Sequence, residues 1–404
     1  MRAEIAMSDA QAGWVIGTAF ALPYGVTALA LAAILRGRGA SIWWLIAGIL
    51  VWTVAGLATG AAHSLGALTL ARAGLGIGQA MFVPVAIAWL VDGTGPRDRA
   101  RALAIFTSGS TIGRSAALLT IGGLLWMLGS IAHGGDDASG TGIADWRWLY
   151  VITALPNLIM LPLLAGIQTG SARDRTTGTT PGTATGATPG TAPDATPDAH
   201  PADRATLALF FAVAIMPIIL IQAIGGWLPS LFVRDRGLVP AQAAMLLGAI
   251  TLVAAPVGQI TGGWLMTRYT AWHDRIPVII FAGLTATLLP LAGLVWAPGL
   301  ASAIAGVAMA NVTLGIASFC GLFGVQMLSP SASRVTVNGV FLALVTLVGV
   351  GAGPLLTGVL ATPGPAAPLG ASLGLALFTT GAIACGGCAI AAAAAQRRYR
   401  LLRA

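Results

Sequence analysis

The sequence contains no lysine and little charge of either sign. Only 8% of its 404 residues are charged and 56% are hydrophobic, and the mean hydropathy is +0.85. Because soluble domains carry about 25% charged residues, this composition excludes an ordinary soluble protein and indicates a chain that lives in lipid. Without lysine there is also no G-x-x-x-x-G-K-[ST] loop, so a nucleotide-driven pump of that type is excluded.

Cysteine and histidine are equally scarce. The three cysteines, Cys320, Cys385 and Cys388, all lie in apolar runs, which excludes a disulfide scaffold and provides no zinc set. The four histidines lie in gaps between apolar runs or in the linker described below. A hydrolase inside the membrane would need a nucleophile beside a base, so we expect neither an enzyme nor a cofactor or metal.

Long apolar runs dominate the rest of the chain. About 20 apolar residues are needed to cross a bilayer as a helix, and eleven runs meet this length. They are continuous and rich in Ala, Leu and Gly, which predicts an all-α membrane protein rather than a β-barrel. The runs are 12–35, 41–61, 66–91, 102–130, 147–167, 205–229, 239–265, 276–297, 299–328, 335–361 and 369–395.

One polar segment divides these runs. Residues 168–204 are rich in Thr, Gly, Pro and Ala, with repeats such as TTPGTATGATPGTAPDATPDA. Such a segment cannot bury enough apolar surface to offset its chain entropy, so it is predicted to be a disordered linker. The chain is thereby divided into an N-terminal half, residues 1–167 with five spans, and a C-terminal half, residues 205–404 with six.

The arginines predict the orientation in the membrane. The formal charge of +8 would suit nucleic-acid binding, but the 21 arginines fall mainly in short gaps between apolar runs, so no nucleic-acid partner is expected. If the gaps alternate sides, fifteen arginines share the side of the linker and the C-terminus, and four lie on the other side. The positive-inside rule then places the linker and the C-terminus in the cytoplasm, in a multi-pass protein of the inner, cytoplasmic membrane.

The two halves differ by about one helix and one loop, since 167 residues hold five spans and 200 hold six. We therefore expect a six-plus-six design from which the first helix is missing, either through a misassigned start or through real loss. The alternative is a natural eleven-helix protein with a short translocated tail.

Several motifs support the six-plus-six design. Residues 8–25, SDAQAGWVIGTAFALPYG, resemble the start of the second helix of the major facilitator superfamily, most of all in bacterial spinster-like members. The R-x-x-x-G-x-G-x-A pattern that begins at Arg72 resembles its fourth helix, Trp146-Arg147-Trp148 the start of its sixth, and the G-P-x-x-x-G from Gly353 its eleventh. This resemblance implies a bundle of two six-helix halves with the substrate near the midplane between them.

Two departures from that pattern concern gating and coupling. The superfamily's G-x-x-x-D-R loop has Leu35 in place of its Asp, followed by Arg36, and the equivalent loop in the second half ends at Thr267-Arg268. We expect Arg36 and Arg268 to act in gating, although without the acid that latches one conformation. Spinster-like proteins typically have Glu where this chain has Gln79, and an amide cannot carry protons.

Charged residues inside a span are costly and indicate function. Arg72 and Arg114 are the two arginines inside spans, and no acid lies in the interior of any run. A guanidinium suits carboxylate, phosphate or sulfonate, so an anionic substrate head is the predicted partner of both. The structural alternative for Arg72 is pairing with backbone carbonyls or with the absent helix. Four neutral residues at midspan are predicted to complete the site, although each could instead make an interhelical hydrogen bond: Tyr24, Gln79, Gln222 and Asn311.

The function predicted from these observations is a monomeric secondary transporter that moves a small organic or amphiphilic anion by alternating access. A facilitator, an exchanger and a coupled carrier all stay open, because the visible spans provide no titrating group. The alternatives are a degenerate, non-transporting membrane protein kept as a sensor or scaffold, and a transporter of lysolipids.

Overall fold

The computed structural model describes residues 4–34, 41–93, 99–133, 145–164, 166, 204–297, 299–329, 334–363 and 372–403. Helices account for almost all of them, and the linker at 168–203 lies outside the described residues. The N-terminal half contains α1 (Asp9–Gly13), η1 (Trp14–Thr18), α2 (Ala19–Ile34), α3 (Ile42–Gly60), α4 (Leu65–Gly93), α5 (Arg99–His133), α6 (Asp145–Ala154) and η2 (Leu155–Ile159).

The C-terminal half follows the same pattern of long helices. It contains α8 (Arg204–Arg236), α9 (Pro240–Arg268), η3 (Thr270–Arg275), α10 (Ile276–Trp296), α11 (Leu300–Leu328), α12 (Arg334–Leu344), η4 (Val345–Val350), α13 (Gly351–Ala361) and α14 (Leu373–Arg403). Each of the eleven predicted runs contains a helix. In the described residues, ten helices are long and apolar enough to cross a membrane, and in α5 the corresponding stretch is the shorter Ile112–Leu128.

The helix ends follow from local chemistry. Ser8 caps α1 through a capping box, in which its Oγ accepts from the Gln11 amide at 3.2 Å and the Gln11 side chain accepts from the Ser8 amide at 2.9 Å. Just after the last residue of α8, Gly237 has a φ of +67°, and the Leu238 amide donates to the Phe232 carbonyl at 3.2 Å. This glycine-based C-cap ends α8.

The sequence prediction was wrong about that end. It closed the run at Pro229 and placed Arg234 and Arg236 in a gap, whereas α8 continues through Pro229 to Arg236. Both arginines therefore lie in the last turn of the helix, where a cation is favoured by the helix dipole.

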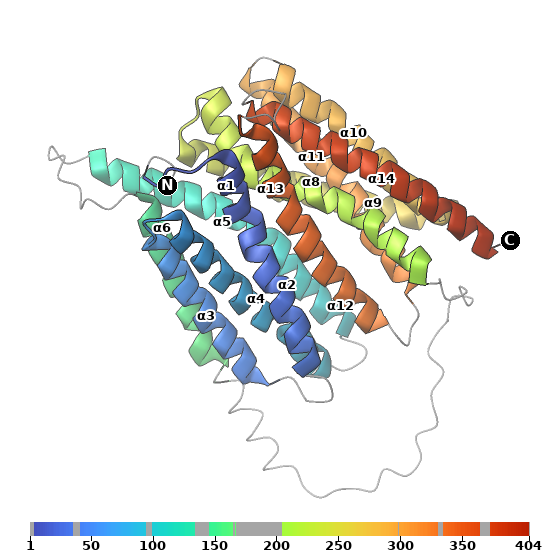
Figure 1. The fold of residues 1–404 in the computed structure, drawn as a ribbon, viewed down its shortest axis with the longest axis horizontal. Coiled ribbons are helices and arrows are strands. Elements are labelled where there is room, and N and C mark those ends of the chain that lie inside the picture. The colour runs from blue at the N-terminus through green and yellow to red at the C-terminus, as the bar shows by residue number, and fades with distance from the viewer. Residues whose placement is uncertain are drawn as a thin grey trace, which may run out of the picture.

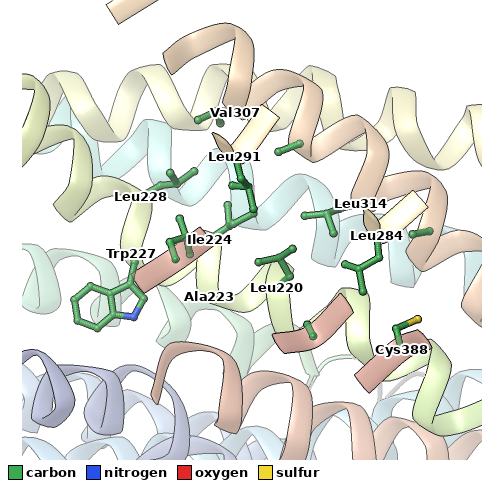
Figure 2. Packing of buried hydrophobic residues seen from close by; sticks show 14 of the residues in the cluster. Leu220, Ala223, Ile224, Trp227, Leu228, Leu284, Leu291, Val307, Leu314 and Cys388 are labelled. Atoms are coloured by element: carbon green, nitrogen blue, oxygen red, sulfur yellow. The ribbon is translucent and has the colours of Figure 1, made fainter. Parts of the chain in front are cut away.

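The core of the C-terminal half forms around α8. Trp227 is fully buried, and its indole Nε1 donates to the Pro354 carbonyl at 2.9 Å. Figure 2 shows how Leu220, Ile224 and Leu228 from the same helix meet Leu284 and Leu291 of α10 and Leu314 of α11. Buried leucine and isoleucine side chains at this spacing hold α8 as the central helix of its half.

The two halves meet most closely at one end of the bundle. We call the end that carries the first residues of α1 and the last residues of α8 and α13 the distal end, and the end that carries Ile34, Arg204 and Arg268 the linker end. In Figure 1, α2 and α3 run steeply downward from the distal end, whereas α8 and α14 run toward the right. The two sets of helices therefore diverge toward the linker end.

Small residues permit the close approach at the distal end. A Cβ on Gly358 of α13 would collide with the Asp9 carbonyl, and one on Gly13 would collide with the Pro354 carbonyl. On the other side of the interface, a Cβ on Gly122 of α5 would meet the Met245 amide of α9 at 2.8 Å. Thr18 at the end of the π-helical η1 adds a hydrogen bond of 2.9 Å to the carbonyl of Gly351, which follows the π-helical η4.

We expect Gly358→Ala to destabilise the protein, because the added methyl has no room between the halves. Overpacking of this kind costs about 1–3 kcal/mol, whereas Gly→Ala in an open helix stabilises by about 0.5–1 kcal/mol. Gly293→Ala in α10 is the matched control, since a Cβ there meets nothing within 4 Å. In thermal unfolding in one detergent, Gly358→Ala should have a lower midpoint than the wild type, and Gly293→Ala should not. Equal midpoints for the two variants would contradict this packing.

Candidate functional site

A cavity of about 340 Å³ lies between the two halves. Its walls are mainly aliphatic, and they come from six separate segments of the chain. The lining residues used below are Arg114, Leu118 and Ile121 of α5, Gln222 and Pro229 of α8, and Asn311 of α11. An apolar chamber with a few polar groups is the usual form of a small-molecule site.

Arg114 provides the only charge among the described residues that line the cavity. Its Nη1 donates to Oε1 of Gln222 at 3.3 Å, so a cation of the N-terminal half is joined to an amide of the C-terminal half. A neutral amide oxygen satisfies one donor of the guanidinium but leaves its charge uncompensated. The remaining donors of Arg114 are thus suited to an anion that enters the cavity.

Asn311 lies in the same cavity, but its amide is partly used within its own helix. Its Nδ2 donates to the Val307 carbonyl one turn earlier at 2.9 Å. Three of the residues predicted for the site, Arg114, Gln222 and Asn311, are therefore brought together.

The other three predicted residues lie elsewhere in the N-terminal half. Tyr24 is 6% exposed and packs its ring against Phe20, with the centroids 5.7 Å apart. Arg72 and Gln79 lie on α4, and neither they nor Tyr24 line the cavity. The buried Nε of Arg72 has no hydrogen-bond partner among the described residues.

Of the two residues predicted for gating, the structure describes one. Arg36 lies outside the described residues. Arg268 is the last residue of α9 and is exposed, with its guanidinium 5.7 Å from the centre of the Tyr269 ring. Its part in gating stays a prediction.

The predicted family is confirmed by comparison with known proteins. A sequence model described as Major Facilitator Superfamily matches residues 1–354. The chain belongs to this superfamily. It is 26% identical to the 3-(3-hydroxy-phenyl)propionate transporter of Escherichia coli over 360 residues, which is 87% of this chain and 78% of that protein. It is also 26% identical to the probable L-galactonate transporter of the same organism, over 32% of this chain and 28% of that protein.

Solved structures show the same superfamily fold. An inward-facing, occupied structure of a bacterial homolog of the human lysosomal transporter Spinster aligns with a TM-score of 0.70 and 22% identity, covering 98% of this chain and 90% of that one. The nucleoside transporter NupG aligns with a TM-score of 0.61 and 13% identity, covering 97% and 91%.

The W-R-W motif of this superfamily member forms a polar cluster that sequence reasoning missed. Arg147, the first residue of the fifth predicted run, is 6% exposed. Its guanidinium donates to Glu4 Oε1 at 3.1 Å and to the Gly60 carbonyl at 2.8 Å, and lies 3.1 Å from His63 Nδ1. The Trp146 indole donates to the other Glu4 oxygen at 2.6 Å. The cluster ties the segment before α1 to α3 and α6.

A second ion pair, also missed, joins the halves at the distal end. Asp9, the first residue of α1, accepts from Arg234 of α8 through both carboxylate oxygens, at 2.9 and 3.2 Å. The one sequence signal was that the predicted topology places both residues on the same side of the membrane. Their pairing depends on how the halves dock.

Glu4 makes the anchor of the first residues sensitive to acid. The hydrogen bond from Trp146 lowers the pKa of Glu4 below 4.5. Desolvation opposes this with a smaller effect, and Arg147 lowers the pKa further. A depressed carboxyl pKa stabilises the folded form fully above the unfolded value, and this stabilisation is lost as the pH falls through the folded pKa.

We therefore expect Glu4→Gln to increase hydrogen exchange at residues 4–8 at neutral pH, relative to the wild type at the same pH. The difference should shrink as the pH falls through the depressed pKa of Glu4, where the wild-type carboxyl becomes protonated. Comparison at matched pH cancels the intrinsic exchange rates. A difference that stays the same from neutral pH down to a pH at which Glu4 is fully protonated would contradict the role of the ionised carboxylate.

Proposed function

We propose that this superfamily member is a carrier for a small organic anion, which it binds in the central cavity through Arg114 and releases on alternate sides of the membrane. The observation that carries the proposal is the contact between Arg114 and Gln222, which belong to opposite halves. An anion that takes the place of the Gln222 oxygen would be held at the boundary between them. It would therefore bind in a position that responds to any relative movement of the halves.

The chemistry of the cavity favours a single carboxylate on a compact apolar body. One guanidinium compensates one negative charge, and no second cation lies among the described lining residues. The aliphatic walls offer few partners for the hydroxyl groups of a sugar, and a volume of about 340 Å³ is at the small end for ligand sites. Two relatives are named for organic acids, one aromatic and one a sugar acid. The walls favour the aromatic type.

The proposed orientation places the linker end in the cytoplasm, because fifteen arginines gather on that side. The protein then lies in the inner, cytoplasmic membrane, and the distal end faces outward. Arg114 is the only titratable side chain among the described lining residues, and a guanidinium keeps its proton at physiological pH. We therefore propose a facilitator or an exchanger, with no proton carried by this cavity.

Replacing Arg114 is the direct test of this function. Proteoliposomes with purified protein should take up labelled 3-(3-hydroxyphenyl)propionate but not its neutral primary amide. Arg114→Gln should lower the apparent affinity by roughly 10- to 150-fold, the equivalent of losing a charged hydrogen bond of about 1.5–3 kcal/mol. Arg114→Lys should retain part of the uptake, since it keeps the charge and loses the planar fork.

Arg397→Gln is the matched control, because Arg397 is exposed near the end of α14 and does not line the cavity. It should transport at the wild-type rate. Equal uptake by Arg114→Gln and the wild type would show that Arg114 does not bind the substrate. If well-folded protein moves no carboxylate of a broad panel above empty liposomes, the transport proposal itself is wrong, and a non-transporting role takes its place.

A further inference from the structure

A second cavity continues from the first toward the distal end. It has a volume of about 430 Å³, and three of its lining residues, Leu118, Ile121 and Pro229, also line the central cavity. Its far wall is formed by the last turns of α8, where Ser230 and Arg234 lie. Arg234 follows Gln222 by twelve residues on the same helix, which corresponds to roughly 18 Å along the axis. The two cavities are thus neighbouring parts of one route between the halves.

Arg234 is the one charged residue among the described residues that line this second cavity. Its two terminal nitrogens hold both oxygens of Asp9, in the fork geometry that a guanidinium offers to any carboxylate. The side chain of Arg234 is 34% exposed and that of Asp9 is 12% exposed, so the acid is the more enclosed partner. Asp9 belongs to the N-terminal half and Arg234 to the C-terminal half.

We propose that Arg234 is a second binding station for carboxylates, which Asp9 occupies while the distal end is closed. When the halves separate at this end, the ion pair breaks, because its partners move with different halves. The guanidinium then stands at the mouth of the route with its fork free, and an incoming carboxylate can take the position that Asp9 has left. This inference rests on the proposed function, because a binding station is useful only to a carrier of carboxylates. Carboxylate binding at Arg234 can nevertheless be measured without transport.

The rival interpretation is that the Asp9–Arg234 ion pair is only a latch, which holds the distal end closed and binds no ligand. A latch predicts that Asp9→Asn and Arg234→Gln behave alike, since either change breaks the pair. A station predicts that they differ, because only Arg234→Gln removes the group that binds the anion. The two variants therefore separate the interpretations.

A thiol introduced by Ser230→Cys reports on the station directly. The substitution is made in a background from which the three buried cysteines, Cys320, Cys385 and Cys388, have been removed. The probe is a neutral maleimide, whose approach is insensitive to local charge, and the competing ligand is 3-(3-hydroxyphenyl)propionate. The primary amide of the same acid serves as the neutral control ligand.

In the Asp9→Asn background, the carboxylate should protect the introduced thiol saturably and the amide should not. In the Arg234→Gln background, half-protection should require a carboxylate concentration roughly tenfold higher or more, as expected when a charge-assisted fork is lost. Arg234→Lys should fall between the two, and it replaces Arg234→Gln if the latter does not fold. Arg236→Gln is the matched control, because Arg236 donates to the Leu294 and Ala297 carbonyls instead, and it should leave protection unchanged.

Equal protection in the Asp9→Asn and Arg234→Gln backgrounds, or no protection in either, would overturn the station. Protection should also persist when Arg114→Gln is added to Asp9→Asn. That result separates the two sites, since the loss of Arg114 would weaken transport without affecting protection of the introduced thiol.

Discussion

The structure depends on how a single guanidinium is accommodated between two apolar bundles. Arg114 carries a charge into a cavity whose described lining contains no carboxylate, and its partner there is an amide from the other half. An unpaired charge in such a site is costly, and a neutral acceptor compensates for it only partly. The proposed anion follows from this constraint. A ligand with one negative charge would satisfy Arg114 better than the protein itself does.

The distal end shows how the halves remain together around that cavity. Glycines on α1, α5 and α13 allow backbones to approach until a Cβ would collide, and such packing matters in lipid because no hydrophobic effect drives helices together there. The Asp9–Arg234 pair and the hydrogen bond from Thr18 to Gly351 add polar contacts across the same interface. The linker end has diverging helices. The structure is therefore closed where small residues line the interface.

Much of the fold could be predicted from the sequence because the bilayer sets the length of a spanning helix. Each of the eleven apolar runs contains a helix, and Arg114, Gln222 and Asn311, which were chosen by their depth along a run, line one cavity. Depth along a run does not show which face of the helix a residue occupies. The prediction therefore grouped Tyr24, Arg72 and Gln79 with them, although these three do not line the cavity. The end of α8 was missed because the apolar run was closed at Pro229, whereas the helix continues to the glycine C-cap at Gly237.

The clusters around Arg147 and Arg234 could not be derived from the sequence for a different reason. Each joins residues that are far apart along the chain, from Glu4 to Arg147 and from Asp9 to Arg234. The sequence predicts which side of the membrane each residue lies on, but the pairing follows from the packing of whole helices. Motif resemblance identified Arg147 as notable without indicating that it is buried against Glu4 and His63.

The central claim is that an anion binds between the halves by replacing Gln222 as the partner of Arg114. A structure of the purified protein with 3-(3-hydroxyphenyl)propionate bound, determined by electron cryomicroscopy, tests it most directly. We expect carboxylate density within hydrogen-bond distance of the Arg114 guanidinium, with the Gln222 oxygen displaced from it. Ligand density elsewhere, with the Arg114–Gln222 contact intact, would contradict the account.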